Sequence, residues 1–346
     1  MTVTAQERDA LIEPVRRLLA DRCTEADVRR IMDGETGHDP ALWRALADLG
    51  VPALTIAEGD GGLGLGATEL ELVMEEAGAA LLPAPLLSCA TAAALLAGSG
   101  DTLLADIAGG ERIVAVAFAG AHDWTGRGDV RVADGHVSGS ARFVPDGALA
   151  DVVLVAGDEG VFAVEGARAT PLPAFDRTRR MADVTFDAPA RQVAGPEAVA
   201  PAFARAVAAL AGEQAGIARA MLARTVDYAR ERHQFGRAIG SFQAIKHMAA
   251  DLLLESESAT SAAREAARQL DGDAPTRDAA VALAAFACAD AAVRVCADGI
   301  QMHGGIAFTW EHPAHLYLRR ARSAAQLFGD ADRWRDRYLT ALEDQA

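Results

Sequence analysis

The sequence predicts an α+β multidomain fold with an N-terminal helical domain, a middle antiparallel β-barrel or sandwich, and a C-terminal four-helix bundle. Three changes of pattern predict it: apolar residues recur at helical spacing over the first hundred residues, alternate with a period of two from about 111 to 195, and return to helical spacing after Pro196. We therefore place the domains at residues 1–108, 109–195 and 196–346. A chain of 346 residues is long enough to give such units a substantial core.

The first domain is predicted from helix-start signals. Asp39 and Pro40 supply an N-cap and a proline at the first helical position, and Thr68 with Glu71 has the spacing of a capping box. Between them, the glycine-rich segment 59–66 is not followed by a P-loop lysine and is not framed by a strand–turn–helix unit. We therefore interpret this segment as a tight turn between helices.

The middle domain is predicted from short strands separated by turn residues. Asp134-Gly135 is a hairpin signal between apolar alternations at 130–132 and 136–138, and Val152 to Val155 forms a short apolar run. Because no helical segment separates these strands, a compact antiparallel barrel or sandwich is favoured.

The third domain is predicted from long apolar stripes. Ile217, Met221 and Tyr228 mark the face of one helix, and Ile245 with Met248 marks the face of the next. Two more helices follow, and a short one closes the chain near 333–342. Four antiparallel helices of this kind make a bundle.

Composition excludes several classes of protein. Acidic residues outnumber basic ones by 49 to 33, so the net charge is −16, which argues against nucleic-acid binding. The longest charge-free run is divided by Pro83 and Pro85, and the N-terminus lacks a hydrophobic signal core, so we expect no membrane insertion and a cytoplasmic location. His312 and His315 lack further ligands at metal-binding spacing, so no metal site is predicted. The cysteines, which follow no disulfide framework, are expected to be free thiols: Cys23, Cys89, Cys288 and Cys296.

Two segments of the third domain carry residues suited to binding a nucleotide. The turn at 230–246 combines Arg232 with two glutamines and two aromatic rings, and an arginine at a helix end can hold a pyrophosphate bidentately. The segment 301–308 contains Gly304 and Gly305 at a helix end, where glycine lets the backbone approach a ligand closely. Each segment taken alone is also compatible with a solvated turn.

Together, and in this order of domains, the two segments resemble the acyl-CoA dehydrogenase family over nearly the whole chain. The match is carried by R-x-Q-F-G…F-Q at 232–243, followed about sixty residues later by Q-x-x-G-G at 301–305. The resemblance implies FAD at a subunit interface, with the second segment closing on the same dinucleotide from the neighbouring protomer. The residues it implies for FAD are Arg232 at the pyrophosphate, Gln234 and Phe235 along the adenosine, Gln243 nearby, and Gln301, Gly304 and Gly305. Ala307 replaces the family's third glycine.

The family's catalytic residue is missing from this chain. In the family a glutamate removes the α-proton of an acyl-CoA thioester while the flavin accepts the β-hydride, which requires a carboxylate with a raised pKa in a dry pocket. The position of that glutamate holds Phe328, and the alternative position used by some relatives holds Ala206. The nearest acid to the second position is Glu213, two turns along. Asp330, two residues past the first position, is the candidate for a replacement base.

The middle domain departs from the family as well. The segments at 118–124 and 142–147 correspond to those that hold the flavin ring in the family, and they do not carry its hydroxyl pattern. The adenosine-side motifs are therefore kept, whereas the flavin-ring and catalytic motifs are lost. This asymmetry favours a subunit that lends adenosine contacts to a partner whose own pocket performs the chemistry.

The resemblance thus implies a FAD-dependent acyl-CoA dehydrogenase subunit of lipid metabolism, which acts on a bulky acyl-CoA within a hetero-oligomer. Short subunits of this type pair with a longer catalytic subunit in α2β2 complexes of actinobacterial steroid side-chain degradation, and electron-transfer flavoprotein is the expected acceptor. Two alternatives stay open. One is a stand-alone dehydrogenase that uses Asp330 as its base, and the other is a non-enzymatic assembly subunit of the same fold.

Overall fold

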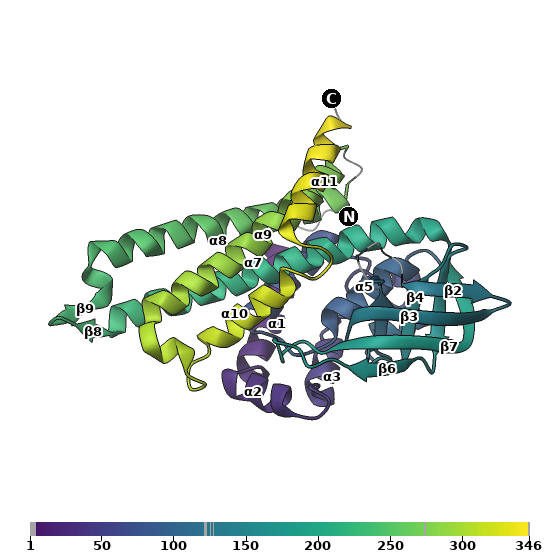
Figure 1. Cartoon of the computed structure of the whole chain (residues 1–346), viewed down its shortest axis with the longest axis horizontal. Coiled ribbons are helices and arrows are strands. Elements are labelled where there is room, and N and C mark those ends of the chain that lie inside the picture. The colour runs from purple at the N-terminus through teal and green to yellow at the C-terminus, as the bar shows by residue number, and fades with distance from the viewer. Residues whose placement is uncertain (1–4, 121–122, 125, 127, 273–274, 345–346) are drawn as a thin grey trace.

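The computed structural model describes residues 5–120, 123–124, 126, 128–272 and 275–344. Three parts follow one another along the chain: a set of helices, a curled sheet, and long helices that extend away from the sheet (Figure 1). This order confirms the predicted fold class.

The N-terminal part is helical. Its α-helices are α1 (Ala5–Arg22), α2 (Glu25–Asp33), α3 (Pro40–Asp48), α4 (Ala67–Ala79), α5 (Leu86–Leu96) and α6 (Leu103–Ala108). Asp39 caps α3, as predicted, by accepting the backbone N–H groups of Ala41 and Leu42 at 2.9 and 3.2 Å. The glycine-rich segment forms turns around a short 3-10 helix at Glu58–Asp60, which agrees with its interpretation as a connection between helices.

The predicted capping box of α4 is wrong. The N-cap is Gly66, whose N–H donates to Glu69 at 3.0 Å, whereas Glu71 is buried inside the molecule. Asp271, which directly follows the second long helix of the bundle, accepts the N–H groups of Ala67 and Thr68 at 2.6 and 2.9 Å. A carboxylate two hundred residues away therefore satisfies the first donors of α4, and no local pattern could reveal it.

The middle part is one curled sheet. Its strands are β1 (Val114–Ala117), β2 (Asp129–Ala133), β3 (His136–Pro145), β4 (Val152–Ala156), β5 (Val161–Glu165), β6 (Arg168–Pro171) and β7 (Met181–Ala194). They lie in the order β1-β4-β5-β7-β3-β2, with β6 also beside β7. The predicted hairpin at Asp134-Gly135 is confirmed, with positive φ at both residues. β1 and β4 pair in parallel, which differs from the antiparallel prediction. The β2–β3 hairpin lies between them in sequence and supplies the length that a parallel connection requires.

The C-terminal part contains the long helices. They are α7 (Val199–Glu231), α8 (Gln243–Leu270), α9 (Arg277–His303), α10 (Ala314–Ala324) and α11 (Ala331–Glu343). By length and composition α9, continued to Phe308, could span a bilayer, but 61% of its apolar window is buried inside the molecule. Its hydrophobicity is therefore that of a bundle core, which α7, α8, α10 and α11 cover (Figure 1).

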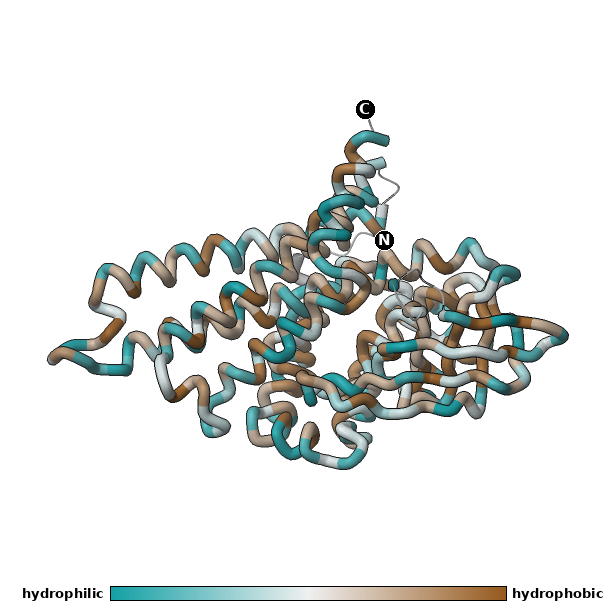
Figure 2. The backbone as a smooth tube through the Cα atoms, viewed as in Figure 1, coloured by the Kyte–Doolittle hydropathy of each residue, from teal (hydrophilic) through white to brown (hydrophobic). Residues whose placement is uncertain are grey.

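The helices of the first and third parts are joined by a close crossing. A Cβ on Gly78 of α4 would lie 2.0 Å from the carbonyl oxygen of Glu213 on α7, and one on Gly216 would lie 1.9 Å from that of Glu75. Only glycine allows this approach, so α4 and α7 share one hydrophobic core. Figure 2 shows apolar and polar residues alternating along the helices and along the strands of the sheet.

Candidate functional site

The two segments singled out in the sequence meet at the end of the bundle farthest from the sheet (Figure 1). Between α7 and α8 the chain forms a small hairpin of β8 (His233–Gln234) and β9 (Arg237–Ala238), and α9 ends beside it. A cleft of about 540 Å³ opens there. Its lining residues are Tyr228, Arg232, Gln234, Phe235, Ile239, Phe242, Ala244, Ile245, Gln301, Met302, His303, Gly304 and Gly305. We call it the nucleotide cleft.

The hairpin is shaped by its own sequence. Arg232 ends α7 in an extended conformation, and its carbonyl accepts the N–H of Ile239 at 2.8 Å. Phe235 and Gly236 form the turn, with φ of 54° and 78°. Glycine is favoured at the second position because it adopts a positive φ readily. This turn leaves the ring of Phe235 92% exposed. Phe235 thus presents an exposed aromatic side chain at the cleft.

The end of α9 forms the opposite wall. Gly304 has φ of 70° and ψ of −150°, and its N–H donates back to the carbonyls of Ile300 and Gln301. A Cβ on Gly304 or Gly305 would meet no atom within 4 Å, so the absence of a side chain there leaves backbone open to the cleft. The glycine pair thus provides a surface that a ligand can approach closely.

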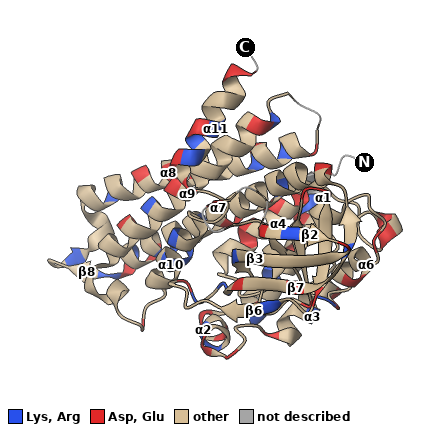
Figure 3. Ribbon diagram, turned by 45° about the vertical axis from the view of Figure 1, so that its right-hand side comes forward, with Lys and Arg blue, Asp and Glu red and all other residues tan. Residues whose placement is uncertain are grey.

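The cleft also carries positive charge that is not neutralised inside the chain. Arg232 makes no ion pair with any described residue, and neither does Lys246 on the first turn of α8. Helix α8 begins at Gln243, and its N-cap residue Phe242, which lines the cleft, provides no side-chain cap for the first N–H groups of the helix. Figure 3 shows basic residues at this tip of the bundle in a molecule whose net charge is −16. An anionic ligand suits this end.

Six of the seven predicted binding residues lie together in the nucleotide cleft. Both motifs line it within one chain, so they can reach a shared ligand from a single protomer. Gln243 differs, because it is exposed at the start of α8 and is not part of the lining. The sequence did not predict Tyr228 and His303 as binding residues. Their positions carried a signal, because Tyr228 lies one helical turn before Arg232 and His303 directly precedes Gly304.

Phe328, at the position that the resemblance assigns to the family's catalytic glutamate, lies among aromatic rings. Phe328 is 3% exposed and packs edge-on against Phe118, Trp124 and Phe203, with ring centroids 5.5 to 6.1 Å apart. Trp334 stacks on Phe203 at 6.2 Å. We call these five residues the aromatic cluster. It offers no carboxylate, and the segment at 118–124 contributes Phe118 and Trp124 to it, while residues 121–122 of that segment lie outside the described residues.

The second possible position of a base is equally closed. Ala206 is 1% exposed and faces a void of only about 10 Å³, shared with Thr91 and Leu70. That volume holds one water molecule at most. The void beside Ala206 is therefore far smaller than an acyl chain.

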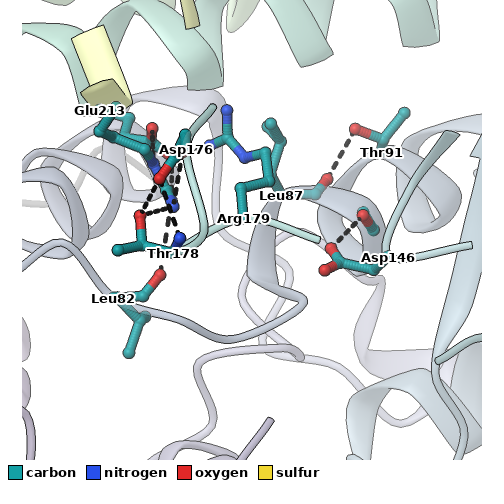
Figure 4. Close-up of polar contacts among 10 residues, drawn as sticks. Leu82, Leu87, Thr91, Asp146, Asp176, Thr178, Arg179 and Glu213 are labelled. Atoms are coloured by element: carbon teal, nitrogen blue, oxygen red, sulfur yellow. Dashed lines mark hydrogen bonds and ion pairs between the residues drawn. The ribbon is translucent and has the colours of Figure 1, made fainter. Parts of the chain in front are cut away.

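Glu213 serves a structural ion pair. It receives hydrogen bonds from Arg179, which precedes β7, and from Arg320 of α10 at 2.9 and 3.2 Å (Figure 4). Asp176 lies 3.7 Å from Arg320, and all four side chains are buried. We call Asp176, Arg179, Glu213 and Arg320 the buried ion cluster. Burial by itself raises the pKa of Glu213, but the charges of Arg179 and Arg320 outweigh it and lower this pKa to about 2, so the carboxylate is a poor proton acceptor.

Asp330 caps a helix. It is exposed, and its carboxylate accepts the N–H of Arg333 at 2.9 Å at the start of α11. Its carboxylate is engaged in the helix cap and stands in solvent. This geometry does not provide the dry pocket that a catalytic base needs.

The fold and the cleft together describe a three-part protein whose bundle end suits an anionic, aromatic ligand such as a nucleotide. The family model for the C-terminal domain of acyl-CoA dehydrogenases matches residues 194–340, and that for the N-terminal domain matches residues 5–102. The chain belongs to the acyl-CoA dehydrogenase family, whose members are oxidoreductases.

Its relatives include the acyl-CoA dehydrogenase IpdE2 of Mycolicibacterium smegmatis, which is 36% identical over 327 residues covering 94% of this chain and 95% of the relative. Among solved structures, the ChsE4-ChsE5 complex from Mycobacterium tuberculosis is 28% identical with a TM-score of 0.90 and covers 99% of both chains. A variant of the Tcur3481-Tcur3483 steroid ACAD is 27% identical with a TM-score of 0.89 and covers 98% of both chains.

Proposed function

We propose that this chain is the non-catalytic subunit of a FAD-dependent acyl-CoA dehydrogenase, and that it lends the nucleotide cleft to a longer catalytic partner. One observation carries the proposal: the nucleotide cleft is open and positively charged, whereas the aromatic cluster fills the place of the family's base. A chain that can hold the adenosine end of a cofactor but offers no base for α-proton removal fits one half of a shared site. The hetero-oligomeric structure neighbours support the same conclusion.

The residues of the cleft fit FAD. Arg232 supplies an uncommitted guanidinium for the pyrophosphate, and Gln234 and Gln301 supply amides for polar groups of adenosine. Gly304 and Gly305 leave backbone open where a Cβ would intrude on a ligand. When bound, the flavin accepts the hydride that leaves the β-carbon of the acyl thioester. The part of this chain is to bind and orient the adenosine end, and the aromatic cluster keeps acyl-CoA out of its own pocket.

The proposal extends to the substrate, the subunit assembly and the electron acceptor. We propose a bulky acyl-CoA of steroid side-chain or other lipid metabolism, an α2β2 assembly, and electron-transfer flavoprotein as the acceptor, on the strength of the family and of the steroid ACAD neighbours. A cytoplasmic location is proposed because Cys23, Cys89, Cys288 and Cys296 are all buried free thiols in the structure.

The test is co-expression of this chain with longer acyl-CoA dehydrogenase subunits from the same organism. The expected product is a complex of equal subunit numbers that contains FAD and reduces a ferrocenium acceptor with an acyl-CoA, whereas the chain alone is inactive. Arg232→Ala in this chain is expected to lower the FAD content of the complex at least tenfold, because a charge-assisted bond to the pyrophosphate is lost. Arg230→Ala is the matched control, since that exposed arginine pairs with Asp227 and lies outside the lining.

Two results would replace this proposal by one of the alternatives. Acyl-CoA oxidation by the chain alone, abolished by Asp330→Asn, would establish a stand-alone dehydrogenase. Full FAD content and full activity of the complex with Arg232→Ala would leave this chain as an assembly subunit only.

A further inference from the structure

His303 is a buried residue of the nucleotide cleft with a fixed ring. Its side chain is 4% exposed and lines the cleft directly before the glycine pair. The ring stacks on Tyr228 of α7, with centroids 4.5 Å apart and 25° between the planes. His312 packs beside it at a centroid distance of 4.6 Å. Contacts from two directions therefore hold the imidazole in one orientation.

The hydrogen bonds of His303 define its tautomer. Nδ1 lies 2.7 Å from the carbonyl oxygen of Gly299, and because a carbonyl can only accept, Nδ1 carries the proton. Nε2 of the neutral ring then keeps a lone pair. It has no hydrogen-bond partner among the described residues and is not one of their buried unpartnered polar atoms, so it is an accessible nitrogen on a residue that lines the cleft. Burial lowers the pKa of His303, which keeps the ring neutral near pH 7.

We propose that Nε2 of His303 accepts a hydrogen bond from the exocyclic amino group of the adenine of FAD, which makes His303 a specificity residue for the base. This inference rests on the proposed function. Phe235 and Phe242, edge-on at 6.1 Å, and Tyr228 surround the same cleft with aromatic surface that suits a flat base. Arg232, the charged residue of the lining, suits the phosphates instead.

A fixed acceptor distinguishes adenine from hypoxanthine. The amino group of adenine donates, whereas hypoxanthine has a carbonyl at the same position, so two acceptors would face each other with neither satisfied. A site built around one buried hydrogen bond rejects such an analogue strongly. His303 is therefore expected to exclude inosine nucleotides from the cleft.

The test is calorimetric titration of the full chain with ADP, IDP and FAD. Wild-type protein is expected to bind ADP about tenfold more tightly than IDP. In His303→Phe, which keeps an aromatic ring against Tyr228 but removes the acceptor, ADP affinity should fall about tenfold and the preference over IDP should disappear. His247→Phe, on the exposed face of α8, is the matched control and should keep the preference.

The outcomes separate this inference from the proposed function. If neither this chain nor its complex with the catalytic partner binds ADP or FAD, the proposed function fails and the inference fails with it. If ADP and FAD bind but IDP binds as tightly as ADP, the inference is overturned while the proposed function stands, and this comparison requires no variant. A preference for ADP that survives in His303→Phe also overturns it.

Discussion

Phe328 has φ of 66°, a left-handed backbone conformation that costs a residue with a side chain about 1–2 kcal/mol. Gly329 follows with φ of 112°. The buried contacts of the Phe328 ring with Phe118 and Phe203 hold the turn in this conformation. This turn, at the position that the resemblance assigns to a catalytic carboxylate, directs an aromatic ring into the core.

Glu71 of α4 is a second residue whose environment decides its chemistry. It is 1% exposed, and neither carboxylate oxygen has a hydrogen-bond partner among the described residues. Burial, followed by the nearby charge of Glu75, raises the pKa of Glu71 from 4.5 to about 8. The folded state therefore holds a neutral carboxylic acid at pH 7.

The raised pKa predicts the pH dependence of stability. Between pH 4.5 and 8 the unfolded chain has released this proton and the folded chain retains it, so the free energy of unfolding falls as pH rises. We expect Glu71→Gln to lie within about 1 kcal/mol of wild type in urea unfolding at pH 5 and to exceed it by about 4 kcal/mol at pH 8.5.

Glu69→Gln is the control for this prediction. Glu69 lies on the same helix but bonds Arg8 and the N–H of Gly66, both at 3.0 Å. Its loss should destabilise the protein at both pH values. Equal stability of wild type and Glu71→Gln at pH 8.5 would show that Glu71 is ionised in the folded state.

At the scale of elements, α4 depends on α8 for its start. The carboxylate of Asp271 accepts two backbone N–H groups of α4 and the hydroxyl of Thr68 at 2.6 Å. We expect Asp271→Ala to lower the free energy of unfolding by about 1–2 kcal/mol, as the loss of a helix cap does. Asp271→Asn, which keeps an acceptor, should lose less in the same denaturation experiment. Wild-type stability of the alanine variant would contradict the role of this cap.

The hairpin between α7 and α8 contrasts with α4, because its shape follows from local sequence. Gly236 supplies the positive φ that the turn requires, and the motif around it is recognisable from the residue types alone. The same is true of Gly304 at the end of α9. The candidate site could therefore be predicted from sequence for most of its residues, since glycine, arginine and glutamine positions define its backbone and its donors.

At the scale of the whole molecule, the buried ion cluster joins the middle and C-terminal parts. Arg179 comes from the segment directly before β7 in the middle part, whereas Glu213 and Arg320 come from the bundle, and Arg320 also reaches the carbonyl of Leu82 in the N-terminal part at 3.4 Å. Removing one member of a buried charge network leaves uncompensated charge, which costs about 3–5 kcal/mol.

We therefore expect Glu213→Ala to lower the free energy of unfolding by about 3–5 kcal/mol in urea at pH 7. Because the folded pKa of Glu213 is about 2, the wild-type advantage should persist above pH 4.5 and shrink as pH falls toward 2. Asp332→Ala, which removes the exposed partner of Arg335, should change stability by less than about 1 kcal/mol. A comparable loss in both variants would show that the buried ion cluster does not join the parts.

The sequence by itself determined the order of helices and strands, the β2–β3 hairpin, the family and the motifs of the nucleotide cleft, because periodicity, turn residues and short motifs are local properties. Only the tertiary structure decided that both motifs meet in one chain, that Glu213 is held by Arg179 and Arg320, and that His303, which lines the cleft, has an accessible nitrogen. The physical reason is that these features depend on burial and on partners far away in sequence. Burial and distant charges set the protonation and pairing of a side chain, and neither is written in its neighbours along the chain.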